Sequence, residues 1–152
     1  MNKKDLMIIT QLRNDSRMTL TKISRKTSIP VSTIYDKIQS FKGDIITKHT
    51  SLLDFSKLGY NARINMLLKV ERESRDSLKK YLEIHQNINS VFKVSNGYDF
   101  LMEGIFRNIK DVEEFIEDLE QKFKVEQKQV FYIIDEIKKE DFMNNKDLLE
   151  IV

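Results

Sequence analysis

A run of hydrogen-bonding side chains follows Pro30, the only proline of the chain. Hydroxyl, carboxylate and ammonium groups can bond phosphate oxygens or base edges, and the methyl of Thr33 can pack on a thymine methyl. The candidates for this chemistry are Ser32, Thr33, Tyr35, Asp36 and Lys37. Such groups read a nucleic acid only when one rigid element presents them together, so the surrounding elements decide the interpretation.

Three short helical patterns fill the first third of the chain. Apolar periodicity predicts helices over residues 5–12, 19–27 and 31–42. Pro30 has no amide proton and cannot continue the second helix, but it suits the first turn of the third. Two short helices joined by a tight turn are typical of a helix-turn-helix whose second helix enters the DNA major groove. An ordinary three-helix bundle with a solvated polar surface is the alternative.

Charge is distributed unevenly along the chain. Residues 1–50 carry ten Lys and Arg against four Asp and Glu, a net charge of +6, and the remainder carries −4. Affinity for a phosphate backbone comes largely from basic side chains that displace condensed counterions. The candidates for phosphate contacts are Arg25, Lys26, Lys42 and Lys48. The division therefore predicts a DNA-binding first part and a second part with another role.

A β-prone run over residues 45–53 follows Gly43 and Asp44. It predicts a small wing that carries Lys48 and His49 beside the third helix. A basic wing in this place favours the DNA-binding interpretation over the plain bundle, and His49 joins the candidate DNA contacts.

The second half changes its hydrophobic period. Apolar residues at every second position predict a half-buried strand over 62–70. Further elements are a helix over 76–85, strands over 91–94 and 100–106, a helix with a stripe from Val112 to Phe123, and a strand over 130–134. The order βαββαβ predicts a ferredoxin-like domain, so the fold class is α+β.

The expected domains are a winged helix-turn-helix over 1–54, a linker over 55–61, the ferredoxin-like domain over 62–142 and a tail over 143–152. Two helices cover only one face of such a sheet. An uncovered apolar face invites association, so we expect a homodimer that pairs sheet against sheet.

Composition excludes several other classes. The 152 residues contain no cysteine, two histidines and no apolar run of membrane-spanning length. No phosphate-cradling glycine loop or metal-ligand spacing is present, so we expect no cofactor, no metal site and no enzymatic activity. A cytoplasmic protein without membrane contact is expected.

The stretch from Asp5 to Gly59 resembles the winged helix-turn-helix of the leucine-responsive regulatory protein/AsnC (Lrp/AsnC) transcription regulators. Its matching residues occur in the family's order and at nearly the family's spacing. The matching positions are Asp5 to Ile9, Leu12, Asp15 to Arg17, Ile23, Ser24, Ser32 to Ile34, Lys37, Ile38, Ile45, Ile46, Leu53, Asp54, Leu58 and Gly59. The chain departs from the family pattern at Ser28, where a glycine is usual, and at Pro30, where a serine is usual. It is also about one residue shorter between Phe41 and Ile45.

The resemblance implies a sequence-specific regulator of double-stranded DNA whose C-terminal module, called RAM, forms dimers and often octamers. It also implies an amino-acid effector at the loop of Asn96, Gly97, Tyr98 and Asp99. Asp99 would receive the ammonium group and loop amides the carboxylate, unless the loop is only a type I′ turn. Two alternatives remain: a metabolite-sensing or assembly protein with non-specific DNA affinity, and an enzyme like the siroheme decarboxylases, whose histidine-rich character is missing here.

Overall fold

Residues 1–144 are described by the computed structural model, and they form two compact units. The first unit contains residues 1–52 together with the segment that begins at Ile137, and the second spans Leu53–Glu136. The boundary near residue 54 thus falls two residues earlier than expected. Residues 137–142, expected in the second domain, lie in the first unit. Of the expected tail over 143–152, positions 145–152 lie outside the described residues.

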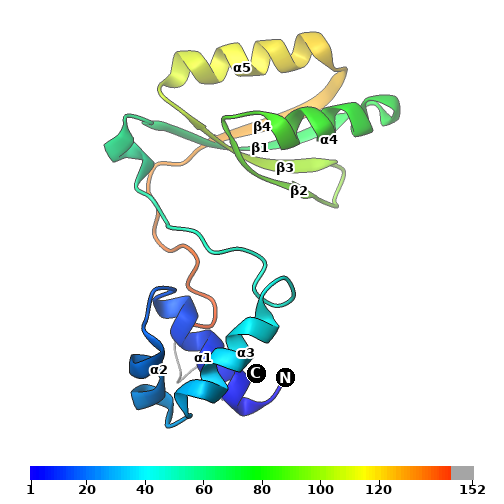
Figure 1. Cartoon of the computed structure of the whole chain (residues 1–152). Helices are drawn as coiled ribbons and strands as arrows, with labels where there is room; N and C mark the ends of the chain where they lie inside the picture. The colour runs from blue at the N-terminus through cyan, green and yellow to red at the C-terminus, as the bar shows by residue number, and fades with distance from the viewer. Residues whose placement is uncertain (145–152) are drawn as a thin grey trace. The chain divides into compact units, whose positions relative to one another are not determined.

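Three helices build the first unit, as the periodicity predicts: α1 (Lys3–Asn14), α2 (Leu20–Thr27) and α3 (Val31–Phe41) (Figure 1). Side-chain caps begin the first two. Asn2 and Asp5 form a reciprocal capping box on α1, and Thr19 accepts from the Lys22 amide on α2. The core of this unit is centred on Ile8, Ile23 and Ile34, which are fully buried.

The predicted wing begins with a tight turn and contains no regular strand. No strand occurs over the described residues 43–54, and the only ladder contact is an isolated bridge between Lys42 and Ile46. The chain turns tightly there, because Gly43 adopts φ +77° and the amide of Ile46 donates to the Phe41 carbonyl at 2.8 Å. Without a partner strand, the β-prone residues that follow have no regular secondary structure and are mostly exposed.

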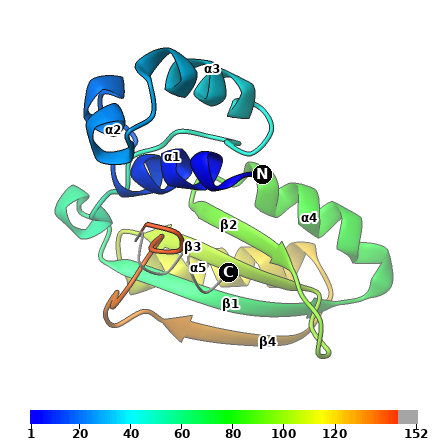
Figure 2. The ribbon, with the colours of Figure 1, turned by 90° about the horizontal axis from the view of Figure 1, so that it is seen from below.

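The second unit has the predicted ferredoxin-like arrangement. Its elements are β1 (Ala62–Val70), α4 (Arg75–Ile84), β2 (Ile88–Lys93), β3 (Phe100–Phe106), α5 (Ile109–Lys122) and β4 (Val125–Tyr132), with a short 3-10 turn, η2 (Arg72–Ser74), before α4. The four strands are antiparallel in the order β2-β3-β1-β4, which can be followed in Figure 2. Helices α4 and α5 cover one face of the sheet (Figure 1).

Alternation places every second residue of β1 in the core under α4 and α5. The last strand differs from its prediction, since it begins at Val125 and ends at Tyr132. Its first half is polar and mostly exposed, so no apolar alternation marks it. The strand forms because its backbone, from Val125 to Tyr132, pairs with β1.

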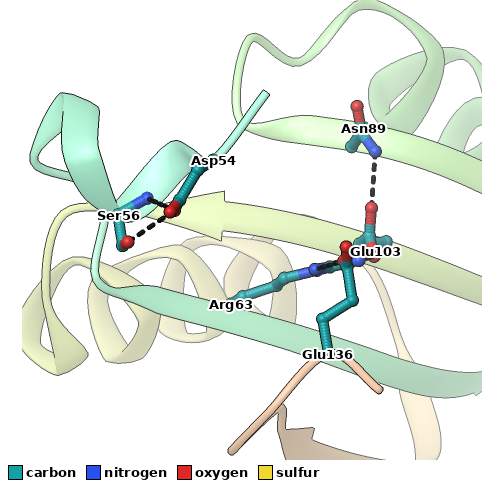
Figure 3. Close-up of polar contacts among 6 residues, drawn as sticks. All are labelled: Asp54, Ser56, Arg63, Asn89, Glu103 and Glu136. Carbon is teal, nitrogen blue, oxygen red and sulfur yellow. Dashed lines mark hydrogen bonds and ion pairs between the residues drawn. The ribbon is translucent and has the colours of Figure 1, made fainter. Parts of the chain in front are cut away.

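The expected linker over residues 55–61 is structured within the second unit. It begins with the 3-10 helix η1 (Phe55–Leu58), capped by Asp54, whose Oδ1 accepts from the amide and hydroxyl of Ser56 (Figure 3). Gly59 ends it at φ +87°, a conformation that suits glycine. Asn61 then donates its amide to the carbonyl of Arg107 at the end of β3.

Candidate nucleic-acid interface and effector loop

A tight turn joins α2 to α3. Ser28 closes α2 in the left-handed region at φ +57°, and its amide donates to the Ser24 carbonyl at 2.8 Å. The hydroxyl of Ser24 donates to the carbonyl of Ile29 at 2.6 Å and holds the turn from inside. Pro30 then begins α3 without a side-chain cap. The turn keeps its helix-turn-helix geometry although a serine occupies the strained position.

One face of α3 is buried and the opposite face is exposed. Ile34 and Phe41 lie in the core. Four of the exposed polar residues share helical spacings of three and four and so form one stripe. The α3 stripe consists of Ser32, Tyr35, Asp36 and Gln39. The structure thus brings three predicted DNA contacts together. It adds Gln39 to this face. The spacing of seven residues between Ser32 and Gln39, two helical turns, could have predicted this position from the sequence.

Lys37 and Thr33 lie beside the stripe, not at its centre. Thr33 is half-buried. Nζ of Lys37 lies 3.0 Å from Oδ1 of the buried Asp5 in the first turn of α1. That oxygen has no other hydrogen-bond donor among the described residues. The amide of Asn2, and then Lys37, lower the pKa of Asp5 below its ordinary value. Lys37 therefore joins α3 to α1, a role that the sequence pattern does not reveal.

The predicted phosphate contacts occupy three places. Arg25 and Lys26 are exposed in the last turn of α2, just before the helix-turn-helix turn. Lys42 is exposed at the end of α3 and donates to the Gln39 side chain at 3.2 Å. Lys48 and His49 line a cleft of about 640 Å³ beside the end of α1.

That cleft also receives Arg13 and Arg17 from the region where α1 ends. Neither arginine was among the predicted site residues. Lys48 and His49 therefore belong to a larger basic group than the sequence pattern indicates. The group lies beside the end of α1.

The predicted effector loop closes the β2–β3 hairpin. Asn96 and Gly97 have φ values of +68° and +85°, as the two central positions of a type I′ turn require. Asp99 is held inside the unit. Its Oδ2 accepts from the Val70 amide at 2.9 Å, and its Oδ1 lies 3.0 Å from Nε of Arg75. The Asp99 carboxylate thus fastens the loop to the end of β1, while Arg75 remains about half exposed.

A second cleft, of about 570 Å³, lies at the other end of β3 from Asp99. Phe55 and Leu58 of η1 form an apolar wall. Tyr60 and Arg107 line the cleft with a cation–π pair, in which the guanidinium carbon lies 5.6 Å from the ring centre. Its residues are spread over η1, β2 and β3, so no sequence motif indicates it.

The sheet face away from the helices is partly charged and partly apolar. At one end Arg63 donates to Glu103 at 2.7 and 2.9 Å and also pairs with Glu136, while Asn89 bonds the other Glu103 oxygen (Figure 3). Two residues before Glu103 on β3, an apolar row crosses the same face. It consists of Phe92 on β2, Leu101 on β3 and Leu67 on β1, which lie opposite one another. Phe92 is 57% exposed.

Histidine and acidic residues do not gather into a site. Within residues 1–144, no group of three or more His, Asp or Glu side chains could hold a metal ion. His85 packs between the rings of Tyr81 and Phe115, at centroid distances of 5.4 and 4.9 Å. Burial, and then the charge of Lys122, lower the pKa of His85.

Within residues 1–144, no helix is both long and apolar enough to span a bilayer.

Two family models match the chain. Residues 64–142, more than half of it, match the Lrp/AsnC ligand binding domain, and residues 1–42 match a winged helix-turn-helix DNA-binding model. An uncharacterized HTH-type transcriptional regulator of Pyrococcus furiosus is 27% identical over 139 residues, covering 91% of this chain and 93% of its own. The HTH-type transcriptional regulator FL11 of Pyrococcus horikoshii is 27% identical over 114 residues, 74% of this chain and 76% of its own.

Solved structures share the fold. A transcriptional regulator of Neisseria meningitidis in complex with L-Met superposes with a TM-score of 0.84 at 17% identity, over 91% of this chain and 93% of that one. LrpC of B. subtilis gives 0.82 at 21% identity, over 91% and 98%. At these identities the likeness shows the fold of each unit.

Proposed function

Because the chain belongs to the Lrp/AsnC family of helix-turn-helix transcription regulators, we propose that it reads double-stranded DNA with the α3 stripe. The observation that carries this proposal is the exposure of Ser32, Tyr35, Asp36 and Gln39 along one face of the helix that follows the tight turn. The basic residues Arg25, Lys26, Lys42, Lys48 and His49 would contact phosphates. The family match favours this function over an assembly protein with only non-specific DNA affinity, and over an enzyme.

The regulator acts in the cytoplasm as a homodimer or a larger assembly. The apolar row of Phe92, Leu101 and Leu67 supports pairing through the open sheet face, since burying it removes exposed apolar surface from water. A two-fold dimer presents two α3 stripes to two half-sites, so the operator would be a pseudo-palindrome.

A small amino-acid effector binds at the loop of Asn96, Gly97, Tyr98 and Asp99. An effector ammonium would replace the half-exposed Arg75 beside Asp99, while the Val70 amide keeps its bond to the other oxygen. The L-Met complex of the Neisseria meningitidis regulator supports an amino acid as the class of ligand. Arg75→Ala should therefore raise effector affinity, and Asp99→Asn should lower it, in calorimetric titrations with an amino-acid series.

Selection of bound sequences from a random DNA pool tests the function, with and without an amino-acid mixture. A shared motif with two half-sites is the expected result, and a changed yield with amino acids would reveal effector coupling. Salt-sensitive binding without any enriched motif would contradict sequence-specific regulation.

A further inference from the structure

The segment 137–144, here called the C-terminal clasp, follows the last strand of the second unit but belongs to the first. One side chain organises it. Arg13, in the last turn of α1, donates from Nη2 to the Glu140 carbonyl and from Nε to the Phe142 carbonyl, both at 2.9 Å. The planar guanidinium presents its donors as a fixed fork, so it holds two carbonyls in one geometry.

The clasp adopts a backbone that requires external support. Glu140 and Met143 have φ values of +53° and +62°, which non-glycine residues rarely adopt unless their surroundings impose them. Met143 is partly buried against the core of α1, α2 and α3. Lys138 pairs with Asp141 at 3.1 Å inside the segment. Hydrogen bonds from Arg13 and apolar packing by Met143 thus both hold the segment 137–144 on the first unit.

We propose that the C-terminal clasp is a second anchor of the DNA-binding unit. The chain crosses between the units once after Leu52 and again after Glu136, and the clasp fastens the second crossing to α1. A unit with two anchors has less rotational freedom to lose when it binds DNA than a unit on one connection. Release of the clasp should therefore lower DNA affinity without changing the preferred sequence.

Docking of the clasp can be tested without DNA. The full-length protein with Arg13→Gln loses the fork, and Arg17→Gln is the matched control. It removes the same charge from the same cleft, but Arg17 makes no hydrogen bond or ion pair to the clasp among the described residues. With methyl-labelled methionine, six signals are expected. The Met143 methyl should keep a folded shift in the wild type and Arg17→Gln, and move to its random-coil position in Arg13→Gln.

Amide exchange gives a second readout. The last turn of α1 should exchange about tenfold faster in Arg13→Gln and in a chain truncated after Glu136, while β1 and β3 stay unchanged. A random-coil Met143 methyl in the wild type would overturn the clasp. So would an unchanged signal in Arg13→Gln together with unchanged exchange in the truncated chain.

The DNA consequence rests on the proposed function, whereas docking does not. For a pool-selected duplex, Arg13→Gln and the truncated chain should bind about tenfold more weakly than Arg17→Gln. Equal losses of DNA affinity in Arg13→Gln and Arg17→Gln, with no loss in the truncated chain, would mean that only the positive charge matters. This result would overturn the role of the clasp as an anchor. Failure of every variant and the wild type to select DNA would contradict the proposed function, while the Met143 signal would still decide docking.

Discussion

Lys37 on α3 and Asp5 on α1 form an ion pair in which Nζ lies 3.0 Å from Oδ1. Asp5 is buried and also completes the capping box of α1 with Asn2. A basic residue of the proposed reading helix thus fixes that helix to α1. The pair determines how α3 is held, and it leaves the α3 stripe to contact DNA.

Replacement of Lys37 by Met should lower the free energy of unfolding by about 1 kcal/mol, because Asp5 then keeps a buried charge without its partner. Urea denaturation measures this, with Lys22→Met as the control on an exposed lysine of α2. Unchanged stability combined with lost sequence preference would instead make Lys37 a DNA-reading residue.

Tyr35 is 53% exposed in the α3 stripe. If it contacts bases, Tyr35→Ala should lower affinity for a selected duplex by about 1–3 kcal/mol and leave random DNA almost unaffected. Lys48→Ala should weaken both duplexes equally, since a phosphate contact carries no sequence information. Fluorescence anisotropy with labelled duplexes measures the two affinities, and equal losses on both duplexes for Tyr35→Ala would remove it from the reading surface.

Ser28 adopts φ +57°, where a Cβ atom is strained. Ser28→Gly should therefore raise the free energy of unfolding by about 0.5–1 kcal/mol, after the greater chain entropy of glycine is included. Ser40→Gly, in the last turn of α3, should lower it by a similar amount, because no left-handed backbone there favours glycine. Thermal unfolding of both variants checks the sign, and a loss for Ser28→Gly would contradict the strain argument.

His85 should make stability depend on pH. Its folded pKa is lowered from 6.5 by burial and by Lys122, with Asp118 opposing. The unfolded chain therefore binds more protons below pH 6.5, so the stabilisation is complete above that pH and is lost as pH falls through the folded pKa. Protonation at Nδ1 also removes the acceptor for the Asn87 amide.

His85→Phe should flatten this slope in urea titrations between pH 5 and 8, because phenylalanine suits the aromatic cluster and does not titrate. His49→Phe, at an exposed position, controls for the general effect of replacing a histidine by phenylalanine. An identical slope in His85→Phe would assign the pH dependence to other groups.

Phe92 tests the sheet-to-sheet dimer. Phe92→Asp should convert the dimer to a monomer in sedimentation experiments, because the apolar row would have to bury a carboxylate. Ile84→Asp is a matched control, since Ile84 is 84% exposed at the end of α4 and lies outside the sheet. A dimer that survives Phe92→Asp would place the interface elsewhere.

Much of the fold could be predicted from local patterns. The alternation from Ala62 to Val70 gives β1 its bounds, and the stripe from Val112 to Leu119 marks α5. The first half of β4 and the missing wing strand were not predictable, because pairing with a distant strand determines them. The α3 stripe was largely predictable, since Ile34 and Phe41 define its buried side.

Local spacing along the chain was enough to predict the order of helices and strands, the turn at Ser28 to Pro30 and the family. Which polar groups are available to a ligand depends instead on how the elements pack. Lys37 bonds Asp5, Asp99 is held by Arg75 and the Val70 amide, and Arg13 binds the C-terminal clasp. Each of these contacts joins side chains and backbone groups that are distant in the chain, so only the packing of the elements could bring them within bonding distance.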